Sequence, residues 1–326
     1  MEIKNINRQN PLFCCVVPCF NEQEVLSHSI SRLKKILDQL IFAQKINTNS
    51  FILFVDDGST DSSWEIIENS SKNDSQIKGI KLSRNFGHQN ALFAGLMYVS
   101  SFVDCAVTID ADLQQDENTI PVFIDFFKQG FDIVFGARQD RSADNFLKKI
   151  TALMFYSLMK LFGVSLIPRN ADFNLLSKNV INALLDYSEV NLFLRGILPS
   201  LGFKSISVSY KVSPRIAGKI KYSWRRMFSL ALNAITSFSV VPIRLIALLG
   251  IIVTFFSVCM IFYVLYSYFF LKAVPGWAST VLPIYLLGGM QILSIAIMGE
   301  YLGKVYLETK RRPRYIIEKS AGEIKE

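Results

Sequence analysis

Two long uncharged stretches in the last third of the chain limit what it can fold into more than any other feature. No charged residue occurs between Arg244 and Lys272, where Leu245–Leu271 is almost wholly apolar, and none occurs between Lys272 and Glu300. A helix needs about 20 apolar residues to cross a bilayer. Both stretches are long enough, and only KAVPGWAST separates them. They predict a transmembrane hairpin with spans at about 245–271 and 279–302, rather than a pair of hydrophobic core helices.

Basic residues flank both outer ends of this hairpin, whereas the loop between the spans carries a single Lys. The flanking residues are Arg225, Arg226 and Arg244 on one side, and Lys304, Lys310, Arg311, Arg312 and Arg314 on the other. By the positive-inside rule, both ends face the cytoplasm. The segment MEIKNINRQN is polar, and LFCCVVP is too short for the apolar region of a signal peptide. We therefore expect a multi-pass protein of the inner (cytoplasmic) membrane whose N-terminal domain stays in the cytoplasm.

The net charge of +8 is concentrated ahead of the hairpin. No Asp or Glu occurs from Val190 to Gly299, and seven of the ten basic residues in that stretch lie between Lys204 and Arg226. Such a block beside a membrane can bind anionic headgroups or phosphates. A nucleic-acid surface is the competing interpretation, and it is disfavoured because the block runs directly into a predicted span. We expect no nucleic-acid partner.

The five cysteines and two histidines indicate neither a disulfide framework nor a zinc site. No two cysteines have CxxC spacing, so we expect buried, reduced thiols, as is typical of cytosolic proteins. His28 and His88 lie far apart in the chain, which argues against zinc.

Short apolar runs alternate with helical patterns through the first half of the chain. The runs are LFCCVVP, FILFV, IKGIKL, CAVTI and FDIVFG, and the helical patterns cover about Glu22–Phe42, Asp61–Ser71, Gln89–Val99 and Glu117–Lys128. Strands that alternate with helices predict an α/β fold with a mostly parallel, doubly wound sheet. In such sheets, ligands bind beyond the carboxyl ends of the strands.

Polar clusters stand at the end of each of the first four predicted strands, namely PCFNE, DDGSTD, SRNFGHQN and DADLQQ. No GxGxxG follows the first strand, and no GxxxxGK[ST] occurs, so an ordinary dinucleotide site or P-loop is excluded. Asp110 and Asp112 follow a buried strand directly, where two negative charges repel each other unless a cation lies between them. A solvated turn is the simpler interpretation. Together with the other strand ends, however, the pair predicts a site for Mg²⁺ or Mn²⁺ and a diphosphate.

A set of motifs in order along nearly the whole chain resembles family 2 glycosyltransferases. The motifs are VVPCFNE, VDDGSTD, LSRNFGHQNALFAGL, IDADLQ, ADFNLL and PRIAGKIKYSWRRMFSLALNAITSFS. More narrowly, the chain resembles polyprenyl-phosphate glycosyltransferases, a group that includes dolichyl-phosphate mannose synthase. The resemblance is greatest to bacterial undecaprenyl-phosphate glucosyltransferases with a C-terminal two-helix hairpin, and it extends to GEYLGKVYLETKRRPRY after the second span.

The resemblance implies a GT-A nucleotide-sugar domain, which is a Rossmann-like, mostly parallel α/β domain, together with interfacial helices and the transmembrane hairpin. We assign residues 1–225 to the cytoplasmic GT-A domain, 226–242 to an interfacial amphipathic helix, 243–303 to the hairpin and 304–326 to a cytoplasmic basic tail. The helical pattern DNFLKKITALMFYSLMKLFG fits either a core-packing or an interfacial helix.

The resemblance also implies roles for individual residues. The nucleotide-sugar site would comprise Pro18, Phe20, Glu22, Val55, Asp56, Asp57, Asp110, Ala111, Gln114 and Arg138. Asp112 would bind the metal directly, with Asp110 beside it, and the catalytic group would comprise Asp112, Asp172, Arg215 and Lys221. The acceptor phosphate would lie near Arg195, Arg215, Lys219 and Lys221. The family often carries two prolines after DLQ, and their absence from DLQQDENTIP predicts a different start to the next helix.

Several of these residues have simpler explanations. Glu22 could be a first-turn acid favoured by the helix dipole, and Asp56 and Asp57 could cap the helix near Asp61. Asp172 could be an N-cap, and Arg195 could be a surface helix residue. If Asp172 acts in the reaction, it either orients the acceptor or serves as a weak base, because a phosphate with a second pKa of about 6 needs no strong base near neutral pH.

The implied reaction is an inverting, metal-dependent transfer of a sugar to undecaprenyl phosphate at the cytoplasmic face of the membrane. Glucose, donated by UDP-glucose, is the sugar that the resemblance favours, with lipopolysaccharide or another cell-envelope glycan as its destination. The resemblance also implies a homo-oligomer, specifically a tetramer.

Three alternatives remain for the function. A processive polysaccharide synthase usually carries QxxRW, and none of Trp64, Trp224 and Trp277 ends such a motif. A glycolipid synthase would use an acceptor without a phosphate. A non-catalytic membrane scaffold is disfavoured by the intact Asp110 and Asp112 pair.

Overall fold

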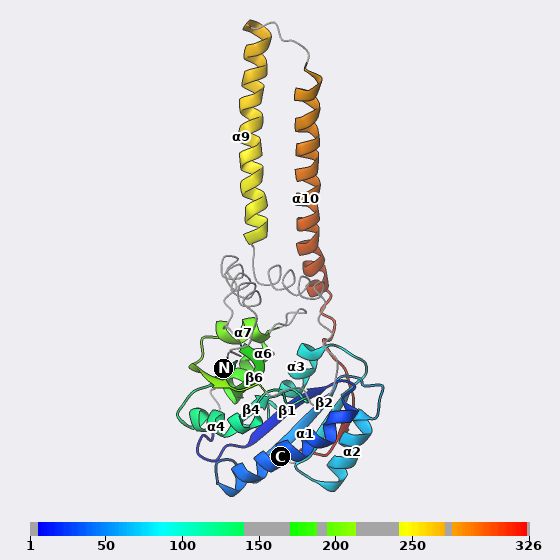
Figure 1. Ribbon diagram of the computed structural model, residues 1–326, viewed down its shortest axis with the longest axis vertical. Helices are drawn as coiled ribbons and strands as arrows, with labels where there is room; N and C mark the ends of the chain where they lie inside the picture. The colour runs from blue at the N-terminus through cyan, green and yellow to red at the C-terminus, as the bar shows by residue number, and fades with distance from the viewer. Residues whose placement is uncertain (1–5, 140–169, 188–193, 213–240, 271–275, 325–326) are drawn as a thin grey trace. The chain divides into compact units, whose positions relative to one another are not determined.

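The computed structural model describes residues 6–139, 170–187, 194–212, 241–270 and 276–324 (Figure 1). The chain forms two compact units, and the first of them is discontinuous in sequence. Unit 1 comprises Met1–Tyr156, Ser165–Lys221 and Arg312–Glu326, and unit 2 comprises Ser157–Val164 and Tyr222–Arg311. The predicted interfacial helix lies outside the described residues except for its last two positions, which begin a helix of unit 2.

Unit 1 is built on a sheet whose described strands follow the order β7-β5-β6-β4-β1-β2-β3-β8. The strands are β1 (Phe13–Cys19), β2 (Phe51–Asp56), β3 (Ile77–Leu82), β4 (Cys105–Thr108), β5 (Ile133–Arg138), β6 (Asn170–Ser177), β7 (Ser205–Tyr210) and β8 (Ile317–Ala321). Neighbours among β1 to β4 pair in parallel, as does β5 with β7, whereas β6 and β8 are antiparallel to their neighbours. The predicted mostly parallel α/β sheet is confirmed.

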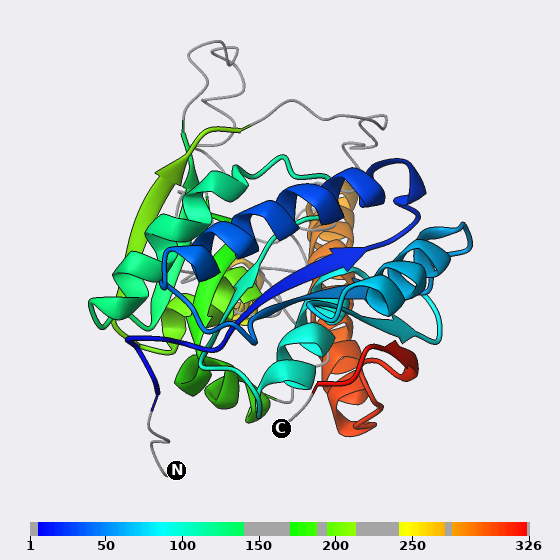
Figure 2. The ribbon, with the colours of Figure 1, turned by 90° about the horizontal axis from the view of Figure 1, so that it is seen from below.

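Helices cover both faces of this sheet (Figure 2). They are α1 (Gln23–Phe42), α2 (Ser63–Asn73), α3 (His88–Val99), η1 (Glu117–Thr119), α4 (Ile120–Lys128), α6 (Lys178–Leu185) and α7 (Leu194–Ser200). Helices α1, α2 and α4 contribute to the main buried cluster with one face of β1 and β2. Helix α3 packs on the opposite face, where a Cβ at Gly95 would lie 2.5 Å from Val16 and 2.7 Å from Val55. Only glycine permits this approach of α3 to the sheet.

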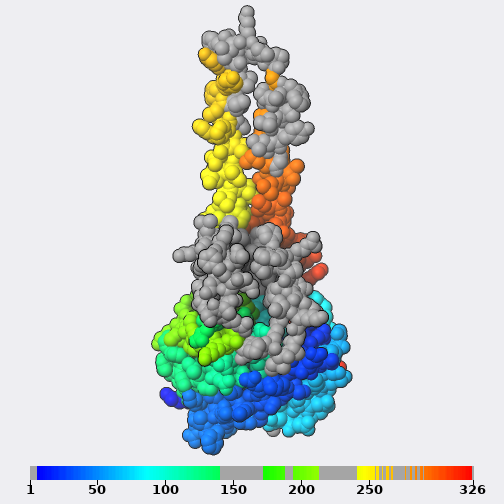
Figure 3. Space-filling view, viewed as in Figure 1, coloured from blue at the N-terminus to red at the C-terminus, as the bar shows by residue number. Residues whose placement is uncertain are grey.

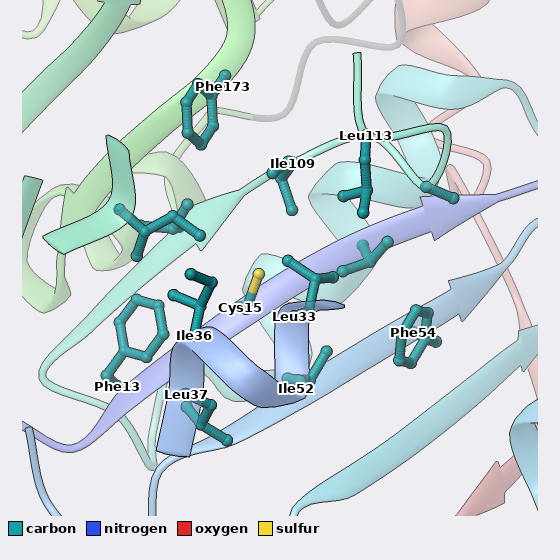
Figure 4. Close-up of a cluster of buried hydrophobic side chains, with 14 of the residues drawn as sticks. Phe13, Cys15, Leu33, Ile36, Leu37, Ile52, Phe54, Ile109, Leu113 and Phe173 are labelled. Atoms are coloured by element: carbon teal, nitrogen blue, oxygen red, sulfur yellow. The ribbon is translucent and has the colours of Figure 1, made fainter. Parts of the chain in front are cut away.

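The main hydrophobic cluster lies between α1 and the sheet (Figure 4). Phe13 and Cys15 of β1 and Phe54 of β2 face Leu33 and other buried residues of α1. Full burial of one such side chain contributes about 1.5–3 kcal/mol. The same cluster includes Ile109 and Leu113 from the DADLQ segment, so the polar strand end is attached directly to the core.

The cysteines of unit 1 are buried thiols without disulfides, which confirms that prediction for Cys14, Cys15, Cys19 and Cys105. Burial raises the pKa of each of these thiols well above its ordinary value. They are therefore packing residues and not nucleophiles.

The C-terminal residues form an edge strand that the sequence analysis treated only as a basic tail. Strand β8 pairs antiparallel with β3, with Lys81 opposite Lys319. Ahead of it, the Arg314 guanidinium lies 4.6 Å from the centre of the Phe93 ring on α3 and donates to the carbonyl of Tyr187. The segment from Arg312 onward therefore belongs to unit 1, to which the chain returns after α10.

Unit 2 contains the two longest described helices, α9 (Val241–Phe270) and α10 (Trp277–Thr309), which run side by side (Figures 1 and 3). The predicted spans fall on these helices. Counted over the residues that the structure describes, no helix meets the combined length and apolarity expected of a membrane crossing.

Candidate active site

The ends of six strands bring the predicted polar residues to one edge of the sheet. Strands β1 to β4 and β5 deliver their carboxyl ends there, and antiparallel β6 begins at the same edge. Thr108, the last residue of β4, pairs with Asn174, and its hydroxyl donates to the carbonyl of Asp172 at 2.8 Å. The register thus brings Asp172 beside the Asp110 segment, although 62 positions separate the two in the chain.

The loops after β1 and β2 are joined by side-chain to backbone hydrogen bonds. Asn21 adopts a φ of 53° and accepts from the Thr60 amide at 2.9 Å, while its own amide donates to Ser59 at 2.9 Å. These bonds fix the segment that carries Pro18, Phe20 and Glu22, and Pro18 pairs with Val55 across the strands. Glu22 is the N-cap residue of α1 and makes no side-chain cap hydrogen bond, and its position at the helix N-terminus is compatible with the helix-dipole explanation.

Asp56 and Asp57 hold the end of β2 and do not cap α2, whose N-cap is Ser62. Asp56 Oδ1 accepts from the Ser59 amide at 3.3 Å, whereas no described group donates a hydrogen bond to its buried Oδ2. Burial raises the pKa of both carboxyls. Asp57 accepts from the amides of Phe86 and Gly87 at 2.7 and 2.9 Å, and so fixes the backbone ahead of α3.

Asp110 is held on one side by Gln115. Gln115 Oε1 accepts from the Asp110 amide at 2.8 Å, and its Nε2 donates to Asp110 Oδ2 at 2.5 Å. The other oxygen, Oδ1, is buried, and no described group donates a hydrogen bond to it. Burial raises the pKa of this carboxyl. A buried acceptor without a hydrogen-bond donor is costly, and His88, whose Nε2 lies 3.5 Å from Oδ1, offsets only part of that cost, so Oδ1 is a candidate ligand for a bound cation.

The segment after Asp110 is strained and anchored. Leu113 has a φ of 47°, which is uncommon for a residue with a side chain, and its buried side chain holds the turn in the core. Ser29 of α1 donates to the carbonyl of Ala111 at 2.5 Å, and the Gln114 amide donates to Asp112 Oδ1 at 3.1 Å. The segment continues into η1, a 3-10 turn capped by Asp116, which precedes α4, and the different helix start stays a prediction.

Asp172 lies in β6, so it is not an N-cap, and it is surrounded by donors. Arg195 of α7 donates to it with Nε and with one terminal nitrogen, both at 2.9 Å, and Gln89 donates at 3.0 Å. Burial favours the neutral acid, but the contact with His88 and the Arg195 charge together hold the pKa of Asp172 well below its usual value. Arg195 is therefore part of a fixed ion pair rather than an isolated surface residue.

His88, the first residue of α3, contacts both carboxylates. Its Nε2 lies 3.3 Å from Asp172 Oδ2 and 3.5 Å from Asp110 Oδ1. Burial lowers the pKa of His88, but Asp172 and Asp110 outweigh that effect and raise it. The sequence analysis assigned no role to His88 or Gln89, although both stand in SRNFGHQN, one of the polar strand-end clusters.

The remaining predicted residues are less closely tied to this cluster. Arg138 ends β5 and donates to the Tyr210 hydroxyl at 3.3 Å. Arg215, Lys219 and Lys221 lie outside the described residues.

The described carboxylates fit a divalent cation that takes its other ligands from a substrate. Within the described residues, no group of three or more His, Cys, Asp and Glu side chains could hold a metal ion on its own. Mg²⁺ and Mn²⁺ accept one or two carboxylates together with phosphate oxygens. The buried Oδ1 of Asp110 and the neighbouring Asp112 would supply the protein's share of such a set.

Comparisons with known proteins identify a family for the N-terminal half of the chain and relatives that align with nearly all of it. The profile described as glycosyl transferase family 2 matches residues 14–184. A Bacillus subtilis (strain 168) protein named uncharacterized glycosyltransferase YkoT is 44% identical over 96% of this chain and 93% of its own. An Escherichia coli (strain K12) protein named prophage bactoprenol glucosyl transferase homolog is 37% identical over 93% of this chain and 97% of its own.

Among solved structures, a mannosyltransferase from Pyrobaculum calidifontis in complex with GDP-Man and Mn²⁺ is similar at 13% identity. It aligns with a TM-score of 0.49 over 72% of this chain and 65% of that one. A similarity of this size supports no conclusion about ligands.

Proposed function

The chain belongs to glycosyl transferase family 2, and we propose that it transfers a sugar from a nucleotide sugar to a polyprenyl phosphate at a membrane surface. One observation carries the proposal. Asp110, whose buried Oδ1 accepts no hydrogen bond from a described group, and Asp172, which is paired with Arg195, both lie within 3.5 Å of the same atom, Nε2 of His88. A candidate site for a cation and a diphosphate therefore adjoins a fixed guanidinium that could bind a second phosphate. A reaction between two phosphorylated substrates requires positive charge for both of them.

On the donor side, Asp110 and Asp112 would hold Mg²⁺ or Mn²⁺, and Asp56 and Asp57 would lie along the nucleoside. When bound, the cation supplies Lewis-acid neutralisation of the leaving diphosphate. Gln115 orients Asp110 so that Oδ1 is not used by the protein's own amides. The inverting outcome follows if the acceptor phosphate attacks the anomeric carbon directly and the nucleoside diphosphate leaves.

On the acceptor side, we assign Asp172 an orienting role and not that of a base. Its pKa is held well below the usual value, and its oxygens already accept from Arg195 and Gln89. The acceptor phosphate is largely ionised near neutral pH, so no proton needs removal. Asp172 fixes Arg195, and the positive charge of Arg195 would face the acceptor, together with Arg215, Lys219 and Lys221.

The membrane hairpin belongs to the proposal and rests on two observations. Large apolar side chains are exposed along both helices of unit 2, among them Ile251 at 67%, Phe255 at 67% and Leu302 at 70%. Such surfaces are unfavourable in water and suit a lipid environment. The chain also leaves unit 1 and returns to it as β8, so an inserted unit 2 would cross the bilayer an even number of times.

With the basic flanks of the hairpin, these features favour the cytoplasmic membrane with unit 1 on the cytoplasmic side. Undecaprenyl phosphate is the proposed acceptor and UDP-glucose the proposed donor, by likeness to the relative named for bactoprenol and glucose. The expected homo-oligomer stays a prediction.

The test is a panel of nucleotide sugars offered to the full-length protein in membranes. UDP-glucose, UDP-galactose, UDP-N-acetylglucosamine and GDP-mannose are each combined with undecaprenyl phosphate, undecaprenol or diacylglycerol, with Mg²⁺, Mn²⁺ or a chelator. We expect a lipid-linked product only with the phosphorylated acceptor and only with a divalent cation. Transfer to diacylglycerol would identify a glycolipid synthase, and the absence of product from every pair would leave no support for a transferase.

A further inference from the structure

The first turn of α3 links the two halves of the candidate site. His88 contacts Asp110 at 3.5 Å on the donor side and Asp172 at 3.3 Å on the acceptor side. Gln89, the next residue, contacts the acceptor side alone in the described structure. Its Nε2 donates to Asp172 at 3.0 Å, and its Oε1 accepts from the Leu194 amide at 3.2 Å.

The Gln89 contacts reach the acceptor group from two directions. Asp172 belongs to β6, and Leu194 begins α7, whose second residue is Arg195. The side chain of Gln89 therefore joins the carboxylate to the start of the helix that carries its guanidinium partner. Both members of the ion pair are fixed to α3 by one amide group.

Helix α3 is itself well held, as a positioning element must be. Asp57 accepts from the two backbone amides just ahead of the helix, at 2.7 and 2.9 Å. The ring of Phe93, farther along α3, contacts the Arg314 guanidinium and the Tyr315 ring of the C-terminal segment. Gly95 allows the helix to approach the sheet closely. The first turn of α3 thus has a fixed place relative to the strand ends.

We propose that His88 and Gln89 are positioning residues that hold the acceptor-side pair Asp172 and Arg195 in register with the donor-side carboxylate Asp110. The inference rests on the proposed function, because register matters only if two substrates meet there. In-line attack requires the reacting atoms about 3–3.5 Å apart, and a misplacement of about 1 Å can cost about a hundredfold in rate. The two residues should act differently, since His88 touches both halves and Gln89 touches one.

A purely stabilising role does not account for this arrangement. The His88 side chain is 44% exposed, and partly exposed ion pairs contribute little to stability. Asp172 already has a two-point hydrogen bond from Arg195, so the His88 contact adds to a charge that is already paired.

The kinetic test compares His88→Ala, His88→Gln and Gln89→Ala in the full-length protein, with His28→Ala as the matched control. His28 is the chain's other histidine, and it is exposed on α1. We expect His88→Ala to lower kcat/KM at least about tenfold for both substrates. Gln89→Ala should lower kcat/KM for the polyprenyl phosphate with the donor KM close to that of the wild type. His88→Gln, which keeps a donor group, should recover part of the loss.

A second readout does not depend on activity. Hydrogen exchange of peptides that cover 170–177 and 194–200 should be faster in His88→Ala and Gln89→Ala than in His28→Ala. The proposal would be overturned if His88→Ala and Gln89→Ala both had the same kinetic constants and the same exchange rates as His28→Ala. If the wild type transfers no sugar to any acceptor, the proposed function fails, and the exchange result still decides whether the two side chains position β6 and α7. Should His88→Ala unfold, His88→Gln and Gln89→Ala decide by the same exchange measurement.

Discussion

Asp110 and Asp172 are two carboxylates that contact the same histidine and nevertheless have opposite pKa shifts. Asp110 has one oxygen on Gln115 and one buried oxygen that no described group hydrogen bonds, and burial raises its pKa. Asp172 accepts from Arg195 and Gln89, and its pKa is held well below the usual value despite burial. The difference comes from the number of donors, since Asp172 has the lowered pKa although its side chain is 7% exposed and that of Asp110 is 32% exposed.

The comparison separates two tasks that a carboxylate can have in an active site. A carboxylate that the protein leaves short of donors attracts an external cation, which suits Asp110. A carboxylate saturated with donors binds nothing further and keeps its partners in place, which suits Asp172. Substitutions at the two positions should therefore fail in different ways.

The largest effect is expected at the carboxylates of the proposed cation site. Asp112→Ala and Asp110→Asn should each lower turnover more than about a hundredfold, because loss of even an outer-shell partner of a metal ligand costs about 10–100-fold. Steady-state turnover and calorimetric titration with Mn²⁺ and UDP measure the effect. Asp116→Asn is the control, since Asp116 caps η1 in the same loop and Asn caps equally well. Normal activity of Asp112→Ala in a chelator would refute the cation site.

The next effect concerns the geometry of the Asp172 and Arg195 pair. Arg195→Lys keeps the charge but loses the two-point hydrogen bond. We expect kcat/KM for the acceptor to fall about tenfold or more, as charged hydrogen bonds contribute about 1.5–3 kcal/mol, while the donor KM stays constant. Arg8→Lys is the control, because Arg8 pairs with Asp132 at the opposite edge of the sheet. A loss confined to the donor KM would move Arg195 to the other half of the site.

Thermal stability should change in opposite directions at the two carboxylates. Asp110→Asn removes a charge that partial burial disfavours, so the Tm in the absence of metal should rise or stay the same at pH 7. Asp172→Asn leaves the Arg195 charge without its carboxylate and should lower stability by about 1–3 kcal/mol. Differential scanning calorimetry of the two variants and the wild type gives the comparison. Equal losses in both variants would show that the two carboxylates have the same role.

The smallest effect is the pH dependence of that stability difference. Since the folded pKa of Asp172 lies below its unfolded value of about 4, its stabilisation is present above pH 4 and is lost as the pH falls toward the folded pKa. The Tm gap between the wild type and Asp172→Asn should therefore narrow below about pH 4. For Asp110, whose pKa is raised, the destabilisation is present at neutral pH and is relieved on acidification. If the Tm difference between the wild type and Asp172→Asn widened in acid, the pKa of Asp172 would not be lowered in the folded protein.

Local sequence patterns predicted the parallel core and the position of the site at the strand ends, because both depend on short-range alternation. They did not predict the place of β6 between β4 and β5, which depends on pairing with residues far away in the chain. That antiparallel insertion is what brings Asp172 to Asp110. His88 lay inside a cluster that had been singled out, but a lone histidine gives no sign of its partners until the strands are ordered.

The edge strand β8 has a consequence for the order of folding. Strand β3 pairs with β2 on one side and β8 on the other, and β8 follows both helices of unit 2 in the chain. During synthesis, the outer edge of β3 therefore stays open until α9 and α10 have been made. The sheet of unit 1 is completed last, so the contacts of Arg314 and Tyr315 with α3 form only after the hairpin region has left the ribosome. A fragment that ends before residue 312 would lack β8, so β3 would be an unpaired edge strand of the sheet. It would also lack the contacts of the C-terminal segment with α3.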